Sequence, residues 1–181
     1  MIRLFAALAL AALTGSSVAA EDPRPAVKFQ KNIVYGNAGG RELQLDIAIP
    51  SGEGKRPAVV LIHGGAWWFG KRQEMNELAE RFAEHGFVAA TISYRLLPDG
   101  RFPAPVEDCK TAVRFLRANA DRFGIDGRRI GAIGLSAGAY LACMLGAAGK
   151  DAGFEGIEHA DQSSGVQAVV GFFGPTDLSP F

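Results

Sequence analysis

A serine flanked by small residues marks a predicted junction between a strand and a helix. Ser136 is the centre of a G-x-S-x-G pattern whose glycines are Gly134 and Gly138. An apolar run at residues 129–135 precedes it and a helical pattern at 137–148 follows, which is the context of a nucleophile elbow. Because such a turn is tight, its flanking residues must be small, and the serine hydroxyl is left exposed. The pattern indicates that Ser136 is a catalytic nucleophile that forms an acyl-enzyme.

A second glycine-rich motif, H-G-G-A-W-W at residues 63–68, follows the apolar run 59–62. Glycines adopt unusual backbone angles and carry no side chain, so this loop can turn its N–H groups toward a ligand. In acyl transfer, preorganised N–H groups aimed at the developing oxyanion usually give the largest single stabilisation. The two motifs together predict a nucleophile beside an oxyanion-binding loop.

With these motifs the chain resembles the α/β-hydrolase superfamily, in particular its esterase/lipase branch with an H-G-G-x-W loop, similar to secreted bacterial carbohydrate-esterase-like and lipase-like hydrolases. The resemblance runs from about Phe29 to the last residue. Further matching stretches are Tyr94-Arg95-Leu96, F-P-A-P-V-E-D at residues 102–108 and F-F-G-P-T-D-L at residues 172–178.

The resemblance implies roles for several residues around Ser136. The oxyanion hole would be formed by the N–H groups of Gly65, Ala66 and Ala137, and Ala137 also opens a helix whose N-terminus favours negative charge. His63 and Gly64 would support the oxyanion loop. No cofactor and no metal are implied, and water would be the second substrate.

Three aromatic residues are candidates for the substrate pocket. Trp67 and Trp68 follow the oxyanion loop, and Tyr140 lies one helical turn beyond Ser136. Ligand pockets are largely apolar with a few polar groups, which suits these side chains. Packing in the core is the alternative for each of them.

A general base for Ser136 is not evident. Enzymes of this type order their triad as Ser, then Asp or Glu, then His, and His159 is the only histidine after Ser136. The helix after Ser136 runs back about 18 Å, so His159 is expected in a surface loop at the opposite edge of the sheet. His85 is expected at a helix end, and Asp177 is expected to cap a helix or brace a loop.

The chain is therefore interpreted as the N-terminal portion of a longer hydrolase, cut before the catalytic acid and His. Its final strand, at residues 166–173, would leave an uncovered apolar sheet edge, which natural proteins avoid.

The remaining sequence pattern predicts an α/β fold with a doubly wound, mostly parallel sheet, the N-terminal portion of an α/β-hydrolase fold. A hairpin at its start provides an antiparallel edge. Strands are expected at residues 29–35, 42–49, 59–62, 87–93, 129–135 and 166–173, and helices at 75–85, 103–123 and 137–148.

The N-terminus has the form of a secretory signal peptide. Arg3 precedes a short apolar run and small residues lead to Ala20, so cleavage is expected after Ala20. A retained anchor helix is the alternative. The expected organisation is a signal peptide at 1–20, a loose leader at 21–28 and a hydrolase domain at 29–181 that is incomplete at its C-terminus. The mature protein would be secreted or periplasmic, without a stable membrane anchor.

Composition limits the partners. Lys plus Arg and Asp plus Glu both number 19, so nothing indicates binding to nucleic acid or to an anionic membrane. Cys109 and Cys143 are the only cysteines. Export permits a disulfide between them, although two buried free thiols are the favoured expectation.

These observations favour a secreted serine hydrolase that cleaves carboxylic esters, with a short acyl group or a link to polysaccharide. Two alternatives remain open: an inactive or noncatalytic relative that lacks the triad, and an amide hydrolase, such as a formamidase or peptidase, on the same fold.

Overall fold

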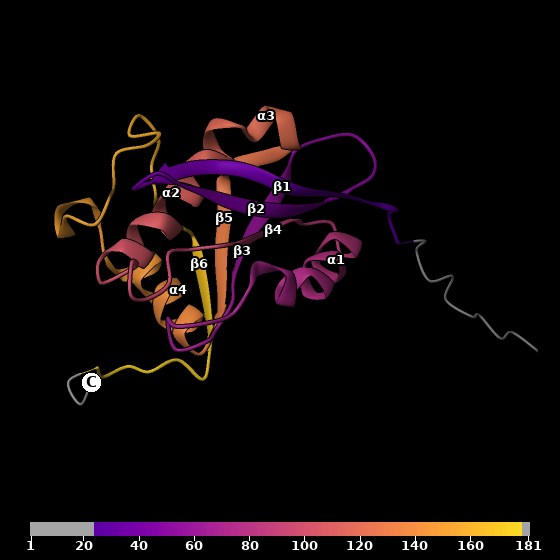
Figure 1. The fold of residues 1–181 in the computed structure, drawn as a ribbon. Helices are drawn as coiled ribbons and strands as arrows, with labels where there is room; N and C mark the ends of the chain where they lie inside the picture. Colours follow the sequence, from indigo (N-terminus) through magenta and orange to yellow (C-terminus); the bar gives the residue numbers. More distant parts are fainter. Residues whose placement is uncertain (1–23, 179–181) are drawn as a thin grey trace, which may run out of the picture.

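Six strands form one mixed sheet in the order β1-β2-β4-β3-β5-β6 (Figure 1). The computed structural model describes residues 24–178, so the expected signal peptide and residues 21–23 of the expected leader lie outside the described residues. β2 is antiparallel to β1 and β4, and the other neighbouring pairs are parallel. The strands are β1 (Val27–Ala38), β2 (Arg41–Pro50), β3 (Arg56–Ile62), β4 (Val88–Ile92), β5 (Ile125–Leu135) and β6 (Ala168–Phe172).

Helices cover both faces of this sheet (Figure 1). Helix α1 packs on one face, against β2 and β4, while α2 and α4 pack together on the other. The helical segments are η1 (Arg72–Met75), α1 (Asn76–Glu84), α2 (Ala104–Ala118), α3 (Ala120–Phe123), α4 (Ala137–Ala147) and η2 (Lys150–Ala152). The doubly wound, mostly parallel α/β fold expected from the sequence is confirmed.

The two central parallel strands bury both of their faces. In β3, Val60 and Ile62 belong to the core under α2 and α4, whereas Val59 and Leu61 belong to the core under α1. Successive side chains of a strand point to opposite faces, so a strand covered on both sides must be apolar throughout. This explains the continuous apolar run that ends at Ile62, directly before the oxyanion loop.

The expected elements are present, with one division. The helix expected at residues 103–123 is split at Asn119, whose side-chain amide donates to the Phe115 carbonyl at 2.9 Å. Gly124 then ends α3 with a left-handed φ of 66°, a conformation that glycine adopts without steric cost. This break turns the chain into β5, which leads to Ser136.

The expectation for the cysteines is half correct. Both are free, and Cys109 is buried, but Cys143 is exposed. Cys143 faces β6 at Gly171, where a Cβ would lie 3.5 Å from its sulfur, so this neighbour has no side chain to cover the thiol.

β6 itself is an edge strand whose Val170 and Phe172 are both 44% exposed, as the sequence indicated. Among the described residues, no helix has the length and apolar character needed to cross a membrane.

Candidate active site

The backbone at Ser136 is strained. Its φ of 53° and ψ of −118° lie where residues with a side chain are rare, and such conformations cost on the order of 1–3 kcal/mol. Hydrogen bonds hold the turn on both sides: the Ser136 N–H donates to the Phe172 carbonyl of β6 at 2.8 Å, and the Ser136 carbonyl accepts from the Ala139 N–H at 2.9 Å. Ser136 is therefore fixed at the junction of β5 and α4.

The two glycines of the elbow are required by close backbone contacts. A Cβ on Gly134 would lie 2.0 Å from the Gly138 carbonyl oxygen, and a Cβ on Gly138 would lie 2.2 Å from the Ile62 carbonyl oxygen. Neither distance is possible for a real side chain. The elbow is thus packed onto itself and onto the end of β3.

The H-G-G-A loop lies directly against the nucleophile. A Cβ on Gly64 would come within 3.2 Å of the Ser136 Cβ, and Gly65 and Ala66 have positive φ angles of 116° and 49°. Within residues 24–178, no hydrogen bond engages the N–H groups of Gly65 and Ala66. Ala137 is the first residue of α4, so its N–H has no acceptor within the helix. The three proposed donors therefore belong to backbone segments that meet at Ser136.

His63, the first residue of this loop, is held by contacts with Gly64 and Tyr94. It is buried, its Nδ1 lies 2.7 Å from the Gly64 carbonyl, and its ring stacks on Tyr94 at a centroid distance of 4.4 Å. The Tyr94 hydroxyl donates to the His63 carbonyl at 3.0 Å. Burial lowers the pKa of His63, despite the hydrogen bond to Gly64, so the ring is neutral at pH 7 and Nδ1–H is the donor to Gly64. This geometry fits a supporting role for His63.

The expected pocket residues separate into two groups. Trp67 and Tyr140 contact each other edge to face, with centroids 5.6 Å apart, and both line a cavity of about 300 Å³. Trp68 is 60% exposed and does not line that cavity. Trp67 and Tyr140 are thus brought together, and Trp68 is not.

The other titratable candidates lie away from Ser136 or in local contacts. The His159 ring contacts Phe115 in the C-terminal half of α2, while the first turn of α2 lines the cavity beside Tyr140. His159 is thus at the far end of α2, as expected. His85 ends α1, with Nδ1 2.7 Å from the Arg81 carbonyl. Asp177 follows β6 at the edge where Ser136 lies.

A buried ion pair that the sequence did not indicate fixes the chain just after the oxyanion loop. Arg72 Nε donates to Asp46 Oδ1 at 2.9 Å, and Asp46 also accepts from the Asn32 N–H at 2.8 Å and the Asn76 side chain at 3.1 Å. Arg72 donates further to the Ser93 hydroxyl at 3.0 Å. Burial alone would raise the Asp46 pKa, but the hydrogen bonds from Asn32, Arg72 and Asn76 outweigh it and lower the pKa.

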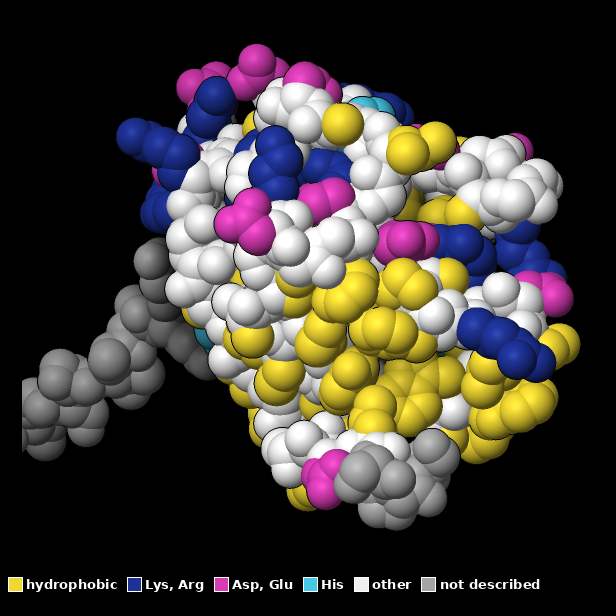
Figure 2. Space-filling model, turned by 90° about the vertical axis from the view of Figure 1, so that its left-hand side faces the viewer, with side chains coloured by type: hydrophobic (Ala, Val, Ile, Leu, Met, Phe, Trp, Pro, Cys, Tyr) yellow, Lys and Arg dark blue, Asp and Glu magenta, His cyan; other side chains and the backbone are white. Residues whose placement is uncertain are grey.

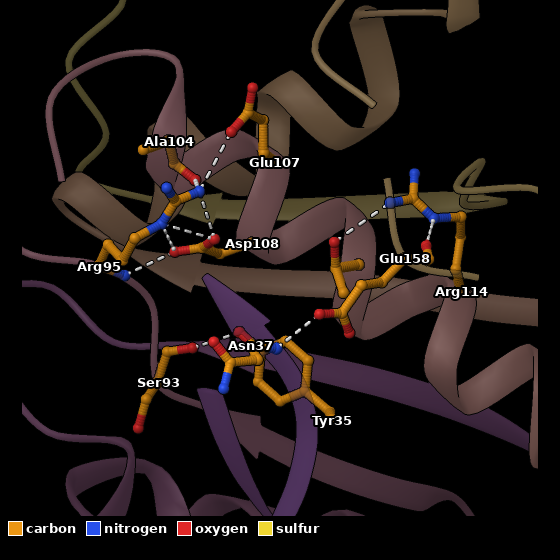
Figure 3. A network of polar contacts seen from close by, with 10 residues as sticks. Tyr35, Asn37, Ser93, Arg95, Ala104, Glu107, Asp108, Arg114 and Glu158 are labelled. Carbon is orange, nitrogen blue, oxygen red and sulfur yellow. Dashed lines mark hydrogen bonds and ion pairs between the residues drawn. The ribbon is translucent and has the colours of Figure 1, made fainter. Parts of the chain in front are cut away.

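A second network holds the segment between β4 and α2 (Figure 3). Arg95 contacts Asp108 through its Nε at 2.9 Å and its terminal nitrogen at 2.7 Å, and contacts Glu107 at 3.1 Å. The Arg95 N–H also donates to Asp108. The two carboxylates at the start of α2 therefore bind an arginine from the segment after β4, a partner that no local sequence pattern indicates.

Glu158, in the loop after α4, links this loop to the β1–β2 hairpin and to α2 (Figure 3). Its carboxylate accepts from the Asn37 N–H at 2.7 Å, and its carbonyl accepts from Arg114 Nε at 2.8 Å. The Tyr35 hydroxyl donates to the Ser93 carbonyl. These contacts brace the back of α2 and do not reach Ser136.

The mixed sheet with helices on both faces is the fold of the α/β hydrolases, and the comparisons with known proteins agree. Residues 45–181 match the model of the BD-FAE family. The chain therefore belongs to the BD-FAE family.

Three similar proteins illustrate this kinship. Esterase LipQ of Mycobacterium tuberculosis is 36% identical over 82% of this chain and 36% of its own length. The structure of Thermogutta terrifontis esterase 2 phosphonylated by cyclosarin has a TM-score of 0.75 at 29% identity, over 87% of this chain and 59% of that one. A truncated form of a carbohydrate esterase from gut microbiota has a TM-score of 0.74 at 25% identity, over 87% of this chain and 60% of that one. The chain thus spans about a third of the curated relative and three-fifths of these solved structures.

Replacing Asp46 with Asn tests the ion pair behind the oxyanion loop. D46N leaves the buried Arg72 without its counter-charge, which costs about 3 kcal/mol of unfolding free energy at pH 7. Because the pKa of Asp46 is lower in the folded state than in the unfolded state, its contribution is complete above pH ~4 and is lost as the pH falls through the folded pKa. Urea unfolding of both proteins from pH 7 down to pH 3 measures the difference.

The matched control is D121N, which removes an exposed carboxylate paired with Lys55. It should leave the unfolding free energy unchanged. If D46N and D121N give the same urea midpoint, the Arg72–Asp46 pair does not hold the loop.

Replacing Gly138 with Ala tests the packing of the elbow. The new methyl group meets the Ile62 carbonyl at 2.2 Å, so we expect a loss of about 2 kcal/mol or more in unfolding free energy. G149A is the control, since Gly149 has a φ of −61° and nothing within 4 Å of its Cβ position. Thermal or urea unfolding compares them, and equal stabilities would show that the elbow is looser than described.

Proposed function

We propose that this chain carries the nucleophile and the oxyanion hole of a hydrolase that cleaves carboxylic esters through an acyl-enzyme on Ser136. The contact between Gly64 and Ser136 carries the proposal, because it joins the two halves of the catalytic apparatus: a Cβ at Gly64 would lie 3.2 Å from the Ser136 Cβ. The esterase names of the similar proteins support the same reaction.

In the proposed reaction, Ser136 Oγ attacks the ester carbonyl carbon and its proton passes to a general base. The oxyanion then accepts hydrogen bonds from the N–H groups of Gly65, Ala66 and Ala137, each worth about 3 kcal/mol in the transition state. The alcohol leaves with a proton, and water hydrolyses the acyl-serine. His63 holds the Gly64 carbonyl through its Nδ1, His85 ends α1 and His159 contacts Phe115, so we assign the base to none of them.

The substrate is proposed to be a neutral ester, either of a short acyl group or linked to polysaccharide. The similarity to a carbohydrate esterase from gut microbiota supports the second form. The balance of acidic and basic residues gives no reason to expect a charged substrate.

The test of this function is the S136A variant of the protein expressed from its complete native reading frame. Release of p-nitrophenol from p-nitrophenyl butanoate should fall by at least about 10³-fold, because the nucleophile is lost while the oxyanion hole remains. In the 181-residue chain, hydrolysis should match that of S136A unless imidazole is added as an external base. Unchanged hydrolysis by S136A in the complete protein would contradict the proposal.

We also propose that the protein is exported and acts outside the cytoplasm. The charged start, short apolar run and small residues before Glu21 support this. The mass of the protein recovered from the periplasm or medium of an expressing bacterium should correspond to a chain that begins at Glu21. Recovery of only the uncleaved chain in the membrane fraction would instead show a retained anchor.

A further inference from the structure

An apolar cavity opens beside the oxyanion loop. It has a volume of about 300 Å³, and its lining includes Trp67, Leu97, Phe102, Val106, Tyr140 and Leu141. Among residues 24–178, no charged side chain lines it. Trp67 directly follows Ala66 of the oxyanion loop, and Tyr140 donates its N–H to the Ser136 carbonyl at 3.2 Å. The cavity therefore begins within one residue of the oxyanion loop and one helical turn of the nucleophile.

The walls of this cavity are held in place. Leu97 donates its N–H to the Trp67 carbonyl at 2.8 Å, which ties the segment before α2 to the oxyanion loop. Arg95 ties the same segment to α2 through Asp108. Because these contacts use backbone and buried charges, the apolar side chains are left to face the cavity.

Apolar surface also surrounds the cavity. Figure 2 shows apolar side chains gathered over a broad part of the face that looks out from α2 and α4. Phe102 is 59% exposed, and its ring packs edge to face on Phe154 at 5.1 Å. Exposed apolar patches of this kind are typical of binding sites.

We propose that this cavity binds the acyl group of the ester, and that the acyl group is apolar and larger than acetyl; this inference rests on the proposed function. An engineered apolar cavity of about 150 Å³ in another protein holds one benzene molecule. A cavity of about 300 Å³ thus accommodates an acyl group of roughly six to ten carbon atoms, linear or aromatic. Each buried methylene contributes about 0.8 kcal/mol, or about fourfold in affinity.

The test measures binding without turnover. The chain has two tryptophans, so W68F leaves Trp67, in the cavity wall, as the sole tryptophan, whose fluorescence is excited selectively over that of tyrosine. The probe is 8-bromooctanoate, an analogue of the acid product whose heavy atom quenches tryptophan on contact, and 3-bromopropionate is the short comparison. We expect saturable quenching by the longer acid, at least about 100-fold tighter than by the shorter one.

Two further variants, made in the W68F background, locate the binding. L97N makes the cavity wall polar and should weaken 8-bromooctanoate binding about tenfold. V34N is the matched control, since Val34 is 44% exposed on β1 and does not line the cavity; it should leave binding unchanged.

The outcomes separate the cavity from the reaction. Equal, weak quenching by the two acids overturns the proposal. Equal binding by L97N and V34N also overturns it, because the acid would then bind at a site outside the cavity. Acyl-length-dependent binding together with hydrolysis that does not need Ser136 would leave the cavity assignment standing and refute the proposed function instead. The comparison of the two acids involves no cavity variant, so it remains decisive even if L97N fails to fold.

Discussion

The strained turn at Ser136 is the constraint on which the rest of the site depends. A residue with a side chain is held at a φ of 53°, and the surrounding structure must supply the roughly 1–3 kcal/mol that this costs. It does so through the hydrogen bond from Ser136 to Phe172 and through the contact of Gly138 with the carbonyl of Ile62. Ile62 ends β3, whose two faces are both buried under helices, so Gly138 packs against a strand that is fixed on both sides.

Two ion pairs hold the loops next to the site in place. Arg72 and Asp46 fix the chain that leaves the oxyanion loop, and Arg95 and Asp108 fix the chain that leaves β4. A buried pair of this kind is weak as a source of stability but strongly penalises any arrangement that separates its partners. The two pairs therefore help to specify the positions of the loops that follow β3 and β4.

The sequence revealed those features that depend on residues close together in the chain. The apolar runs before His63 and Ser136 gave the central strands, and the glycines around Ser136 gave the elbow, since both follow from local backbone requirements. The Arg72–Asp46 pair and the exposure of Cys143 depend on which strands become neighbours, and no local pattern encodes that. Only part of the cavity lining could be predicted from the sequence. Trp67 and Tyr140 follow the two motifs, whereas Leu97 and Phe102 lie in a loop whose position depends on the contacts of Arg95.

The most direct test of a preformed nucleophile is its reaction with paraoxon, diethyl p-nitrophenyl phosphate. In the protein expressed from its complete reading frame, Ser136 Oγ should bond to phosphorus as p-nitrophenolate leaves and the serine proton passes to the base. Peptide mass mapping should then find the diethylphosphoryl group on the peptide that contains Ser136 and on no other serine. A protein that stays unmodified, or that is modified elsewhere, would contradict the account.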